Sequence, residues 1–174
     1  MSGAEFRVSA LIPSADLSQV LGAGAFSAWE QSAFGRNDRG RADRSRLLRE
    51  FETFCRDYPE TVLMATEAGR PLGWGAREHR DHVISDLWVF PEAQRRGVGA
   101  ALLAAMEDAI ANEGFGYVEL ETFTGNPGAV RFYERHGYSA VWRGVKFTAS
   151  LNYELDKIRF RKPLTRSAIG LPET

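Results

Sequence analysis

Along this chain the spacing of hydrophobic residues changes between the two-residue period of strands and the period of about 3.6 residues that marks helices. The helical period predicts helices at about 14–26, from residue 47 to the proline at 59, at 97–112 and at 127–136. The strand period predicts strands at 1–10, 61–67, 72–78, 82–90, 117–123, 138–142 and 153–161. A polar, arginine-rich stretch at 35–46 is expected to be a solvated loop. The order of these elements predicts a mixed α/β (α+β) fold built on one sheet.

The length of 174 residues is that of one globular domain, expected at 1–162 and followed by a C-terminal tail at 163–174. Hydrophobic residues make up 44% and charged residues 26%, which argues against a disordered, collagenous or coiled-coil chain. The formal net charge of -1 gives no basic excess for nucleic acid or for an anionic membrane. No hydrophobic run is long enough to span a membrane, and the N-terminus lacks the pattern of a secretory signal. A cytoplasmic protein is therefore expected.

The cysteine and histidine content argues against a metal site. The single cysteine, Cys55, excludes an intramolecular disulfide and a cysteine zinc site, and it is expected to be a small, partly buried apolar residue. The histidines His79, His82 and His136 lack the helical i, i+4 spacing with an acidic partner that zinc hydrolases use. No bound metal is therefore expected.

The segment 94–100, Gln-Arg-Arg-Gly-Val-Gly-Ala, opens the longest predicted helix shortly after the strand that ends at Phe90. The first turn of a helix has free N–H groups at the positive end of its dipole, and glycine lets a large anion approach the backbone. The segment is therefore a candidate phosphate site, although a helix with packing glycines explains Gly97 and Gly99 equally well. The P-loop lysine is missing, and Leu102 replaces the third glycine of a dinucleotide fingerprint. A nucleotide triphosphatase or a nicotinamide enzyme is therefore disfavoured.

Two motifs flank the helix predicted at 97–112 and the strand predicted at 117–123. The first is Gln94-x-x-Gly97-x-Gly99 after a strand that ends in Val-x-Pro, and the second is Asn126-Pro127-x-Ala129-Val130-x-Phe132-Tyr133-Glu134-x-x-Gly137-Tyr138. With their connection they cover about a third of the chain, and both resemble the signatures of the GNAT acetyltransferase superfamily. The resemblance implies a central, mostly antiparallel twisted sheet of six to seven strands, splayed at the cofactor site and flanked by about four helices. It also implies acetyl-CoA as co-substrate and no metal.

By this resemblance, backbone N–H groups at the helix start would hold the pyrophosphate of coenzyme A, in the loop Gln94, Arg95, Arg96, Gly97, Val98, Gly99 and Ala100. The backbone of Leu87, Trp88 and Val89 would pair with the pantetheine arm, as an added strand pairs with a sheet edge. The N–H of Val89 would also donate to the developing oxyanion. Asn126 would contact the cofactor, or cap the helix before Pro127, or do both.

The resemblance places Tyr133 where the family carries the general acid that protonates the departing thiolate, whereas helical periodicity alone would make it a core residue. Some family members carry a Glu or His base at positions corresponding to Val83 and Ser85, which cannot act in that way here. Glu121 matches a base of the family's protein N-terminal acetyltransferases and is the first candidate. Asp86 and a water chain stay open as alternatives, and Asp86 is expected on the opposite face of its strand unless a bulge turns it.

In this family the acceptor site is built from the first two helices, their loop and the late strands, here about 26–46 and 142–153. Its expected lining is apolar at Trp29, Phe34, Trp142 and Phe147, and acidic, favouring a cationic amine, at Glu30, Asp86, Glu119 and Glu121. The expected reaction is transfer of acetyl from acetyl-CoA to the primary amine of a small molecule or a peptide N-terminus, by direct attack in a ternary complex. A non-catalytic acyl-CoA sensor is the alternative, and a homodimer is left open.

Overall fold

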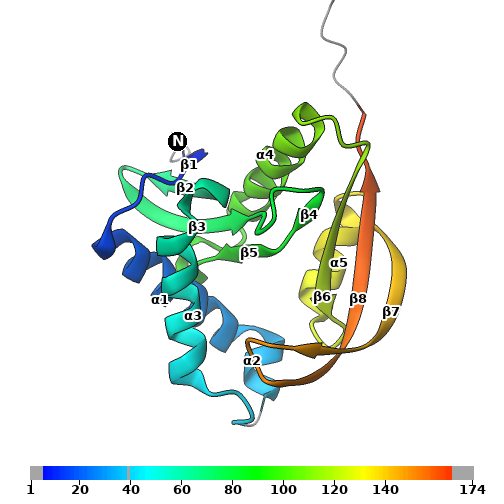
Figure 1. Ribbon diagram of the computed structural model, residues 1–174, viewed down its shortest axis with the longest axis horizontal. Coiled ribbons are helices and arrows are strands. Elements are labelled where there is room, and N and C mark those ends of the chain that lie inside the picture. The colour runs from blue at the N-terminus through cyan, green and yellow to red at the C-terminus, as the bar shows by residue number, and fades with distance from the viewer. Residues whose placement is uncertain (1–5, 39, 166–174) are drawn as a thin grey trace, which may run out of the picture.

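The computed structural model describes residues 6–38 and 40–165 (Figure 1). The N-terminal elements are β1 (Arg7–Ala10), α1 (Ala15–Gln31), α2 (Ala33–Asn37), α3 (Arg44–Asp57), η1 (Pro59–Thr61), β2 (Val62–Glu67) and β3 (Arg70–Ala76). The C-terminal elements are β4 (Val83–Ile84), β5 (Asp86–Val89), η2 (Pro91–Ala93), α4 (Val98–Asn112), β6 (Tyr117–Phe123), α5 (Pro127–Arg135), β7 (Ser139–Thr148) and β8 (Tyr153–Pro163). The mixed α+β class predicted from the sequence is confirmed.

Within the described residues the strands form two four-stranded sheets rather than the single sheet that we expected. The first has the order β1-β2-β3-β5 and is antiparallel, and the second has the order β4-β6-β8-β7, with β4 and β6 parallel. The strand predicted at 82–90 is divided between them, because Val83 pairs with Glu119 of β6 whereas Asp86 pairs with Ala76 of β3. When β4 and β5 are counted as one strand, the described chain has seven, within the predicted range.

The division at Ser85 has a local cause. The N–H of Ser85 donates to the carbonyl oxygen of Ala76 at 2.9 Å, and its hydroxyl oxygen accepts from the N–H of Glu78 at 3.1 Å. Ser85 is thereby bound to the end of β3, and the chain leaves β6 at this point. Figure 1 shows β5 running toward β3 and away from β6, which opens the splay that the sequence predicted.

Helix α1 is longer than predicted. It ends at Gln31 rather than at about Phe26, because the buried residues Ala28 and Trp29 continue its apolar face. Trp74 of β3 packs under this helix and donates its indole N–H to the carbonyl oxygen of Leu21 at 3.1 Å. The extension places Trp29 in the wall of the cavity described below.

The arginine-rich stretch at 35–46 is not wholly a loop, because it contains the end of α2 and the start of α3. Ser32 caps α2 by accepting a hydrogen bond from the N–H of Gly35 at 3.0 Å, and Asp43 caps α3 by accepting from the N–H of Arg46 at 2.9 Å. Both caps satisfy N–H groups that a helix cannot pair internally. The described residues therefore hold five α-helices, in agreement with the expected number of about four.

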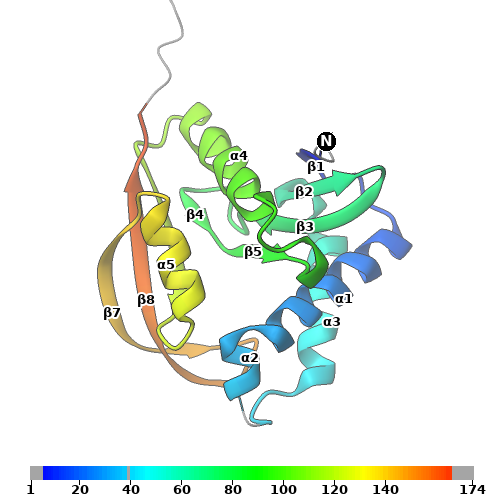
Figure 2. The same cartoon turned by 180° about the vertical axis from the view of Figure 1, so that it is seen from behind.

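Strand β7 continues to Thr148, beyond the end predicted at Trp142. Its partner β8 pairs with it from Ser139 opposite Arg161 to Thr148 opposite Tyr153, with a shift of register between Ala140 and Trp142. Hydropathy did not indicate the extension, because β7 is an outer strand whose side chains are mostly exposed. The long β7–β8 hairpin reaches the neighbourhood of α2 (Figures 1 and 2).

Helices cover both faces of the first sheet. The core under α1 and α3 includes Trp74 and Phe90, whereas Leu102 of α4 packs against Ala65 of β2 on the other face. Figure 2 shows α4 and α5 on the same side of the molecule, where α5 covers the second sheet. The region between the two sheets is thereby bounded by α1 and α3 on one side and by α4 and α5 on the other.

Strand β8 ends at Pro163, and the N–H of Leu164 donates to the carbonyl oxygen of Gly116 at 2.9 Å. The domain bounds of 1–162 stay a prediction. Residues 166–174 of the predicted tail and 1–5 of the first predicted strand lie outside the described residues. No helix in the described part of the chain is long and apolar enough to cross a membrane.

Candidate active site

Strand β5 is an edge strand of the first sheet. Its one neighbour within the described residues is β3, and its opposite edge is open. Its register places Leu87, Trp88 and Val89 opposite Gly75, Trp74 and Gly73. Because the backbone groups of a strand point alternately to its two sides, the outer edge of β5 presents N–H and C=O groups that no strand among residues 6–38 and 40–165 pairs. The three residues predicted to bind pantetheine all belong to this outer strand, and the N–H of Phe90 bonds to Leu72 of the chain next to it, so by alternation Leu87 and Val89 present their backbone groups to the open side.

The N-terminus of α4 is next to this open edge. Its N-cap is Gly97, with φ of 84°, and no side chain caps the helix. The N–H of Ala101 donates to the carbonyl oxygen of Gly97 at 3.0 Å, which is the first bond of the helix ladder. The N–H groups of Val98, Gly99 and Ala100 precede that ladder and lie at the positive end of the helix dipole. They have the properties of an anion site.

Glycine stands at positions 97 and 99 of the loop for different structural reasons. The left-handed backbone of Gly97 favours glycine, although a Cβ there would meet nothing within 4 Å. A Cβ on Gly99 would lie 3.3 Å from Cγ2 of Val89 and 3.5 Å from the ring of Phe132. Gly99 therefore lets α4 approach β5 and α5 closely, as expected of a glycine that is required for helix packing. Its role toward phosphate stays a prediction.

The side chains of the loop hold it in place. Gln94 Nε2 donates to the carbonyl oxygen of Val89 at 3.2 Å, and this bond ties the loop to the end of β5. Arg96 forms an ion pair of 2.5 Å with Glu67, which offsets its charge. Arg95 is exposed and has a positive φ of 59°. The positive charge that the loop offers a ligand therefore comes from Arg95 and the helix dipole more than from Arg96.

Tyr133, the predicted general acid, lies on α5 and is 9% exposed. Its ring packs against Tyr138 and Phe160, with centroid distances of 5.8 and 5.9 Å. Burial raises the pKa of Tyr133, and the negative charge of Asp86 raises it further. The phenol is therefore protonated at neutral pH, as a proton donor must be. The packing role is observed, and the catalytic role stays a prediction.

Asn126 is the N-cap of α5 and precedes Pro127 at the first helical position. Its Oδ1 accepts a hydrogen bond from the N–H of Ala129 at 3.4 Å. The same residue also lines the cavity between the sheets. The capping role is therefore observed, and a contact with a cofactor stays a prediction.

Asp86 faces the cavity instead of the opposite face that simple alternation would give it. The break at Ser85 resets the alternation, since Ile84 packs toward α4 and β6 whereas Trp88 packs against Phe51 of α3. Burial raises the pKa of Asp86, hydrogen bonds from Trp88 and Ser85 oppose this, and the charge of nearby Glu78 raises the pKa further. Asp86 is therefore a stronger base than an exposed aspartate.

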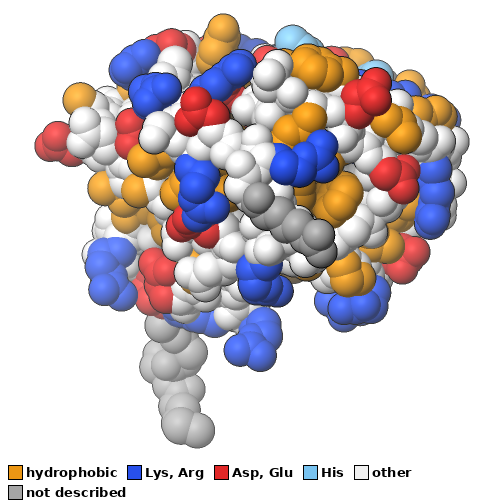
Figure 3. All heavy atoms as spheres, turned by 90° about the horizontal axis from the view of Figure 1, so that it is seen from below, with side chains coloured by type: hydrophobic (Ala, Val, Ile, Leu, Met, Phe, Trp, Pro, Cys, Tyr) orange, Lys and Arg blue, Asp and Glu red, His pale blue; other side chains and the backbone are white. Residues whose placement is uncertain are grey.

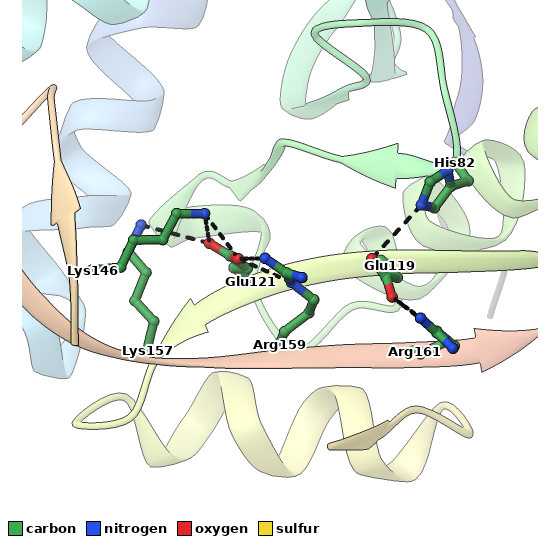
Figure 4. Close-up of polar contacts among 7 residues, drawn as sticks. All are labelled: His82, Glu119, Glu121, Lys146, Lys157, Arg159 and Arg161. Carbon is green, nitrogen blue, oxygen red and sulfur yellow. Dashed lines mark hydrogen bonds and ion pairs between the residues drawn. The ribbon is translucent and has the colours of Figure 1, made fainter. Parts of the chain in front are cut away.

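Glu121 points toward basic side chains of β7 and β8 (Figure 4). Its carboxylate lies 2.7 Å from Arg159 Nη2, 3.0 Å from Lys146 Nζ and 4.0 Å from Lys157 Nζ. Burial alone would raise the pKa of Glu121, but the hydrogen bonds and charges of Arg159 and Lys146 outweigh it and lower the pKa. Glu121 is therefore a weak base whose oxygens are already occupied.

Glu119 lies two residues earlier on the same face of β6 and is 8% exposed. It accepts a hydrogen bond from Arg161 Nε at 2.8 Å and lies 3.7 Å from His82 Nε2 (Figure 4). Arg161 and Arg159 are paired directly opposite Glu119 and Glu121 in the β6–β8 register. Sequence analysis named both carboxylates but missed their basic partners, because these follow from strand register rather than from local sequence.

A cavity of about 580 Å³ opens between the two sheets. Its wall is rich in aromatic side chains, from Trp29, Phe34, Phe51, Phe54, Trp88, Phe123 and Phe147. Charged groups also line it, from Glu50, Glu78, Asp86, Glu121 and Lys157. Figure 3 views the end of the molecule where α2, the start of α3 and the β7–β8 hairpin meet, and hydrophobic, basic and acidic side chains alternate there. The cavity suits an apolar molecule that carries charge.

Three of the four apolar residues predicted for the acceptor site, Trp29, Phe34 and Phe147, do line this cavity. Trp142 is not part of the wall; it pairs opposite Arg159 on β8, whose guanidinium lies 5.7 Å from the centre of its ring. Glu30 is also absent from the wall and forms an ion pair with Arg44. Sequence analysis missed Phe51 and Phe54, although their helical spacing on α3 was visible.

No group of three or more His, Cys, Asp or Glu side chains within 6–38 and 40–165 is placed to hold a metal ion. Cys55 is fully buried in the core under α1 and α3. Burial, with a smaller contribution from the charge of Asp86, raises the pKa of Cys55 to about 12. Its thiol is therefore protonated and inert at neutral pH.

Comparisons with known proteins agree with this geometry. A model of the Acetyltransferase (GNAT) family matches residues 25–138. YhfO of Bacillus subtilis, described as an uncharacterized N-acetyltransferase, is 29% identical over 90 residues, which are 47% of this chain and 60% of YhfO. The structure of a GCN5-related N-acetyltransferase from Rhodopseudomonas palustris has a TM-score of 0.66 and 21% identity, over 94% of this chain and 98% of that one.

YncA of Salmonella typhimurium, whose structure holds its cofactor acetyl-CoA, has a TM-score of 0.62 and 17% identity, over 97% of this chain and 99% of that one. At these identities the solved structures establish the fold, and the predicted α+β architecture is confirmed. The range matched by the family model includes the open edge of β5, the N-terminus of α4 and helix α5. The chain belongs to the GNAT acetyltransferase family.

Proposed function

We propose that this protein is an N-acetyltransferase that transfers acetyl from acetyl-CoA to the primary amine of a small molecule or a peptide N-terminus. One observation carries the proposal: the open edge of β5, the uncapped N-terminus of α4 and the aromatic cavity adjoin one another. A donor with an amide-bearing arm and a diphosphate would use the first two features. An amine would enter through the third, and the two reactants would meet in a ternary complex.

The residues present fit coenzyme A. The N–H groups of Val98, Gly99 and Ala100 would bind the diphosphate, since no side chain caps the helix there. The backbone of Leu87, Trp88 and Val89 would pair with the amides of the pantetheine arm. When bound, acetyl-CoA supplies the acetyl group as an activated thioester.

Asp86 is the proposed general base. An alkylammonium has a pKa of about 10 and must lose a proton before its nitrogen can attack. Asp86 faces the cavity and has a raised pKa, so its carboxylate can accept that proton. Glu121, the first candidate from the sequence, is disfavoured because Arg159 and Lys146 occupy its oxygens and the pKa of Glu121 is lowered.

Tyr133 is the proposed general acid, and its phenolic proton would go to the sulfur of the departing thiolate. Its raised pKa keeps the phenol protonated, and so able to donate, at neutral pH. The backbone N–H of Val89 is the proposed donor to the carbonyl oxygen as negative charge develops on it. These roles need no metal ion.

The test is acetyl-CoA turnover against polyamines, amino acids, aminoglycosides and short peptides. Both the released CoA thiol and the acetylated product should be followed, because thiol release alone also reports hydrolysis. Turnover of at least one amine supports the proposal. Thermal stabilisation by CoA, and none by ATP or NAD, would separate this protein from a nucleotide-binding domain.

An acyl-CoA sensor would share the binding features and differ in lacking turnover. Tight binding of acetyl-CoA with no acetylated product from any amine would favour the sensor. Two observations favour the enzyme: a carboxylate with a raised pKa, Asp86, lines the acceptor cavity, and a buried phenol, Tyr133, lies within reach of its charge. A sensor would need neither group.

A further inference from the structure

The face of the second sheet that borders the cavity has more cations than carboxylates (Figure 4). Its two carboxylates, Glu119 and Glu121, are surrounded by four cations: Lys146, Lys157, Arg159 and Arg161. His82 also lies close to Glu119, and as a histidine it contributes no negative charge that could offset the four cations. This part of the described structure therefore has a surplus of positive charge next to the acceptor cavity.

Lys157 is the cation that the cluster compensates least. Arg159 and Lys146 both lie within hydrogen-bonding distance of Glu121, at 2.7 and 3.0 Å. The ammonium of Lys157 is 4.0 Å from the same carboxylate, which is too long for a hydrogen bond. One negative charge cannot offset three positive ones, so much of the charge of Lys157 is uncompensated.

Lys157 is also the most buried of these cations. Its side chain is 18% exposed, compared with 49% for Lys146 and 39% for Arg159. Burial lowers the pKa of Lys157, and repulsion from Lys146 adds to this against the attraction of Glu121. An ammonium removed from water is unfavourable unless an anion lies close to it. A ligand anion would supply what the protein does not.

The position of Lys157 gives a ligand access to it. It lines both the aromatic cavity and a neighbouring one of about 390 Å³, whose wall also includes Lys146 and Arg159. Asp86 lines the aromatic cavity from the other sheet. One cavity therefore presents a carboxylate from β5, an ammonium from β8 and aromatic walls.

We propose that the acceptor is an amphoteric amine. Its primary amine would lie at Asp86, an aromatic or apolar body would fill the cavity, and an anionic oxyacid group, a carboxylate in its simplest form, would bind Lys157. This inference rests on the proposed acetyl transfer and narrows the acceptor class. Polyamines and aminoglycosides carry only positive charges and have no anionic group for Lys157.

Three para-substituted benzylamines test this inference, because they share the same primary amine and the same aromatic ring and differ only in the para substituent. The first, para-(aminomethyl)benzoate, has an anionic para group. The second, para-methylbenzylamine, has a neutral one, and the third, para-xylylenediamine, has a cationic one. Calorimetry on the CoA-saturated protein measures Kd without requiring turnover. The benzoate should bind about tenfold or more tightly than the methyl compound, and the diamine most weakly. Added salt should narrow these differences.

Two variants locate the effect. Lys157→Met removes the ammonium but keeps the apolar stem, and the advantage of the benzoate should disappear. Arg143→Met is the matched control: Arg143 pairs with Ile158, the neighbour of Lys157 on β8, and so faces the opposite side of the sheet. The control should keep the advantage. Thermal unfolding of both variants shows that each is folded.

Equal binding of the benzoate and the methyl compound to the unmodified protein would overturn the inference, and this comparison needs no variant. An advantage that survives Lys157→Met, or no measurable binding of all three amines, would also overturn it. If the ranking holds but no acetylated product forms, the acetyl-transfer proposal fails while the recognition stands. Acetylation of all three amines with similar Kd values leaves the transferase proposal intact and removes only the amphoteric acceptor.

Discussion

Trp88 Nε1 donates a hydrogen bond of 3.0 Å to Asp86 Oδ1, two residues away on the same side of β5. The indole is held in turn by Phe51 of α3, with ring centroids 4.9 Å apart. The carboxylate is therefore fixed at the cavity wall by its own strand and by a neighbouring helix. A base positioned in this way can receive a proton without first rearranging.

Asp86→Asn should lower kcat/KM by about 10²–10⁴-fold, the usual contribution of a general base. The amide keeps an oxygen to accept the bond from Trp88 but cannot accept a proton. In the unmodified protein kcat/KM should rise with pH as Asp86 ionises, at a pH above the ordinary range of aspartate because its pKa is raised. The variant should lose this rise of kcat/KM with pH, which is the acidic limb of the pH–rate profile. A pH series of initial rates measures both effects.

Glu121→Gln is the comparison for that experiment, because Glu121 also lines the cavity and is the base candidate from the sequence. Its pKa is lowered and its oxygens are engaged by Arg159 and Lys146, so its loss should reduce the rate far less and leave the acidic limb in place. If Glu121→Gln removes the limb and Asp86→Asn does not, the two assignments must be exchanged.

The same two variants should change stability in opposite directions at neutral pH. Asp86 has a raised pKa in the folded state, so the folded protein binds its proton more tightly, and stability falls as pH rises through that pKa. Asp86→Asn should therefore raise Tm at neutral pH and change it little well below the ordinary pKa of aspartate. Glu78, Tyr133 and Cys55 are the titratable groups coupled to this carboxylate.

Glu121 has a lowered pKa, so its contribution to stability is present above the ordinary pKa of glutamate and is lost as pH falls through the folded value. Glu121→Gln should lower Tm at neutral pH and have less effect in acid. For a domain of this size each kcal/mol moves Tm by about 2–4 °C. Calorimetric scans from acid to neutral pH measure both variants, and shifts of the same sign would contradict the prediction.

The parts of the fold that depend on local sequence could be predicted. Apolar periodicity placed the helix at 97–112 and the strand at 117–123, and the observed elements are Val98–Asn112 and Tyr117–Phe123. The two motifs flank these elements, so the open edge and the helix N-terminus could also be located. Each of these features is encoded by residues that are close together in the chain.

The remaining features depend on which strands pair, and that information is not local. The break at Ser85 requires the end of β3, whose carbonyl at Ala76 bonds to it, and without the break Asp86 would face away from the cavity. The cations around Glu121 come from β7 and β8, so their approach follows from strand register. A one-residue change of register would place them on the other face.

Tyr133→Phe should lower kcat by about 10²-fold or more at neutral pH while leaving the Kd for CoA unchanged. The substitution removes the proton donor but keeps the ring that packs against Tyr138 and Phe160. Tyr138→Phe is the control, because Tyr138 lies in the same core cluster but its hydroxyl is held by Glu107 at 2.8 Å and is not the proposed proton donor. A normal rate for Tyr133→Phe would exclude the phenol from the mechanism.

Gly97→Ala should weaken CoA binding by about tenfold, because a Cβ at φ of 84° favours a backbone change at the start of α4 that would misdirect its N–H groups. Gly40→Ala is the matched control: it has φ of 76°, no neighbour within 4 Å of a Cβ, and a place between α2 and α3. Both variants should lose similar stability in thermal unfolding, since the backbone strain is alike. Calorimetry with CoA should separate them, and equal affinity in the two variants would show that the α4 N-terminus does not bind the diphosphate.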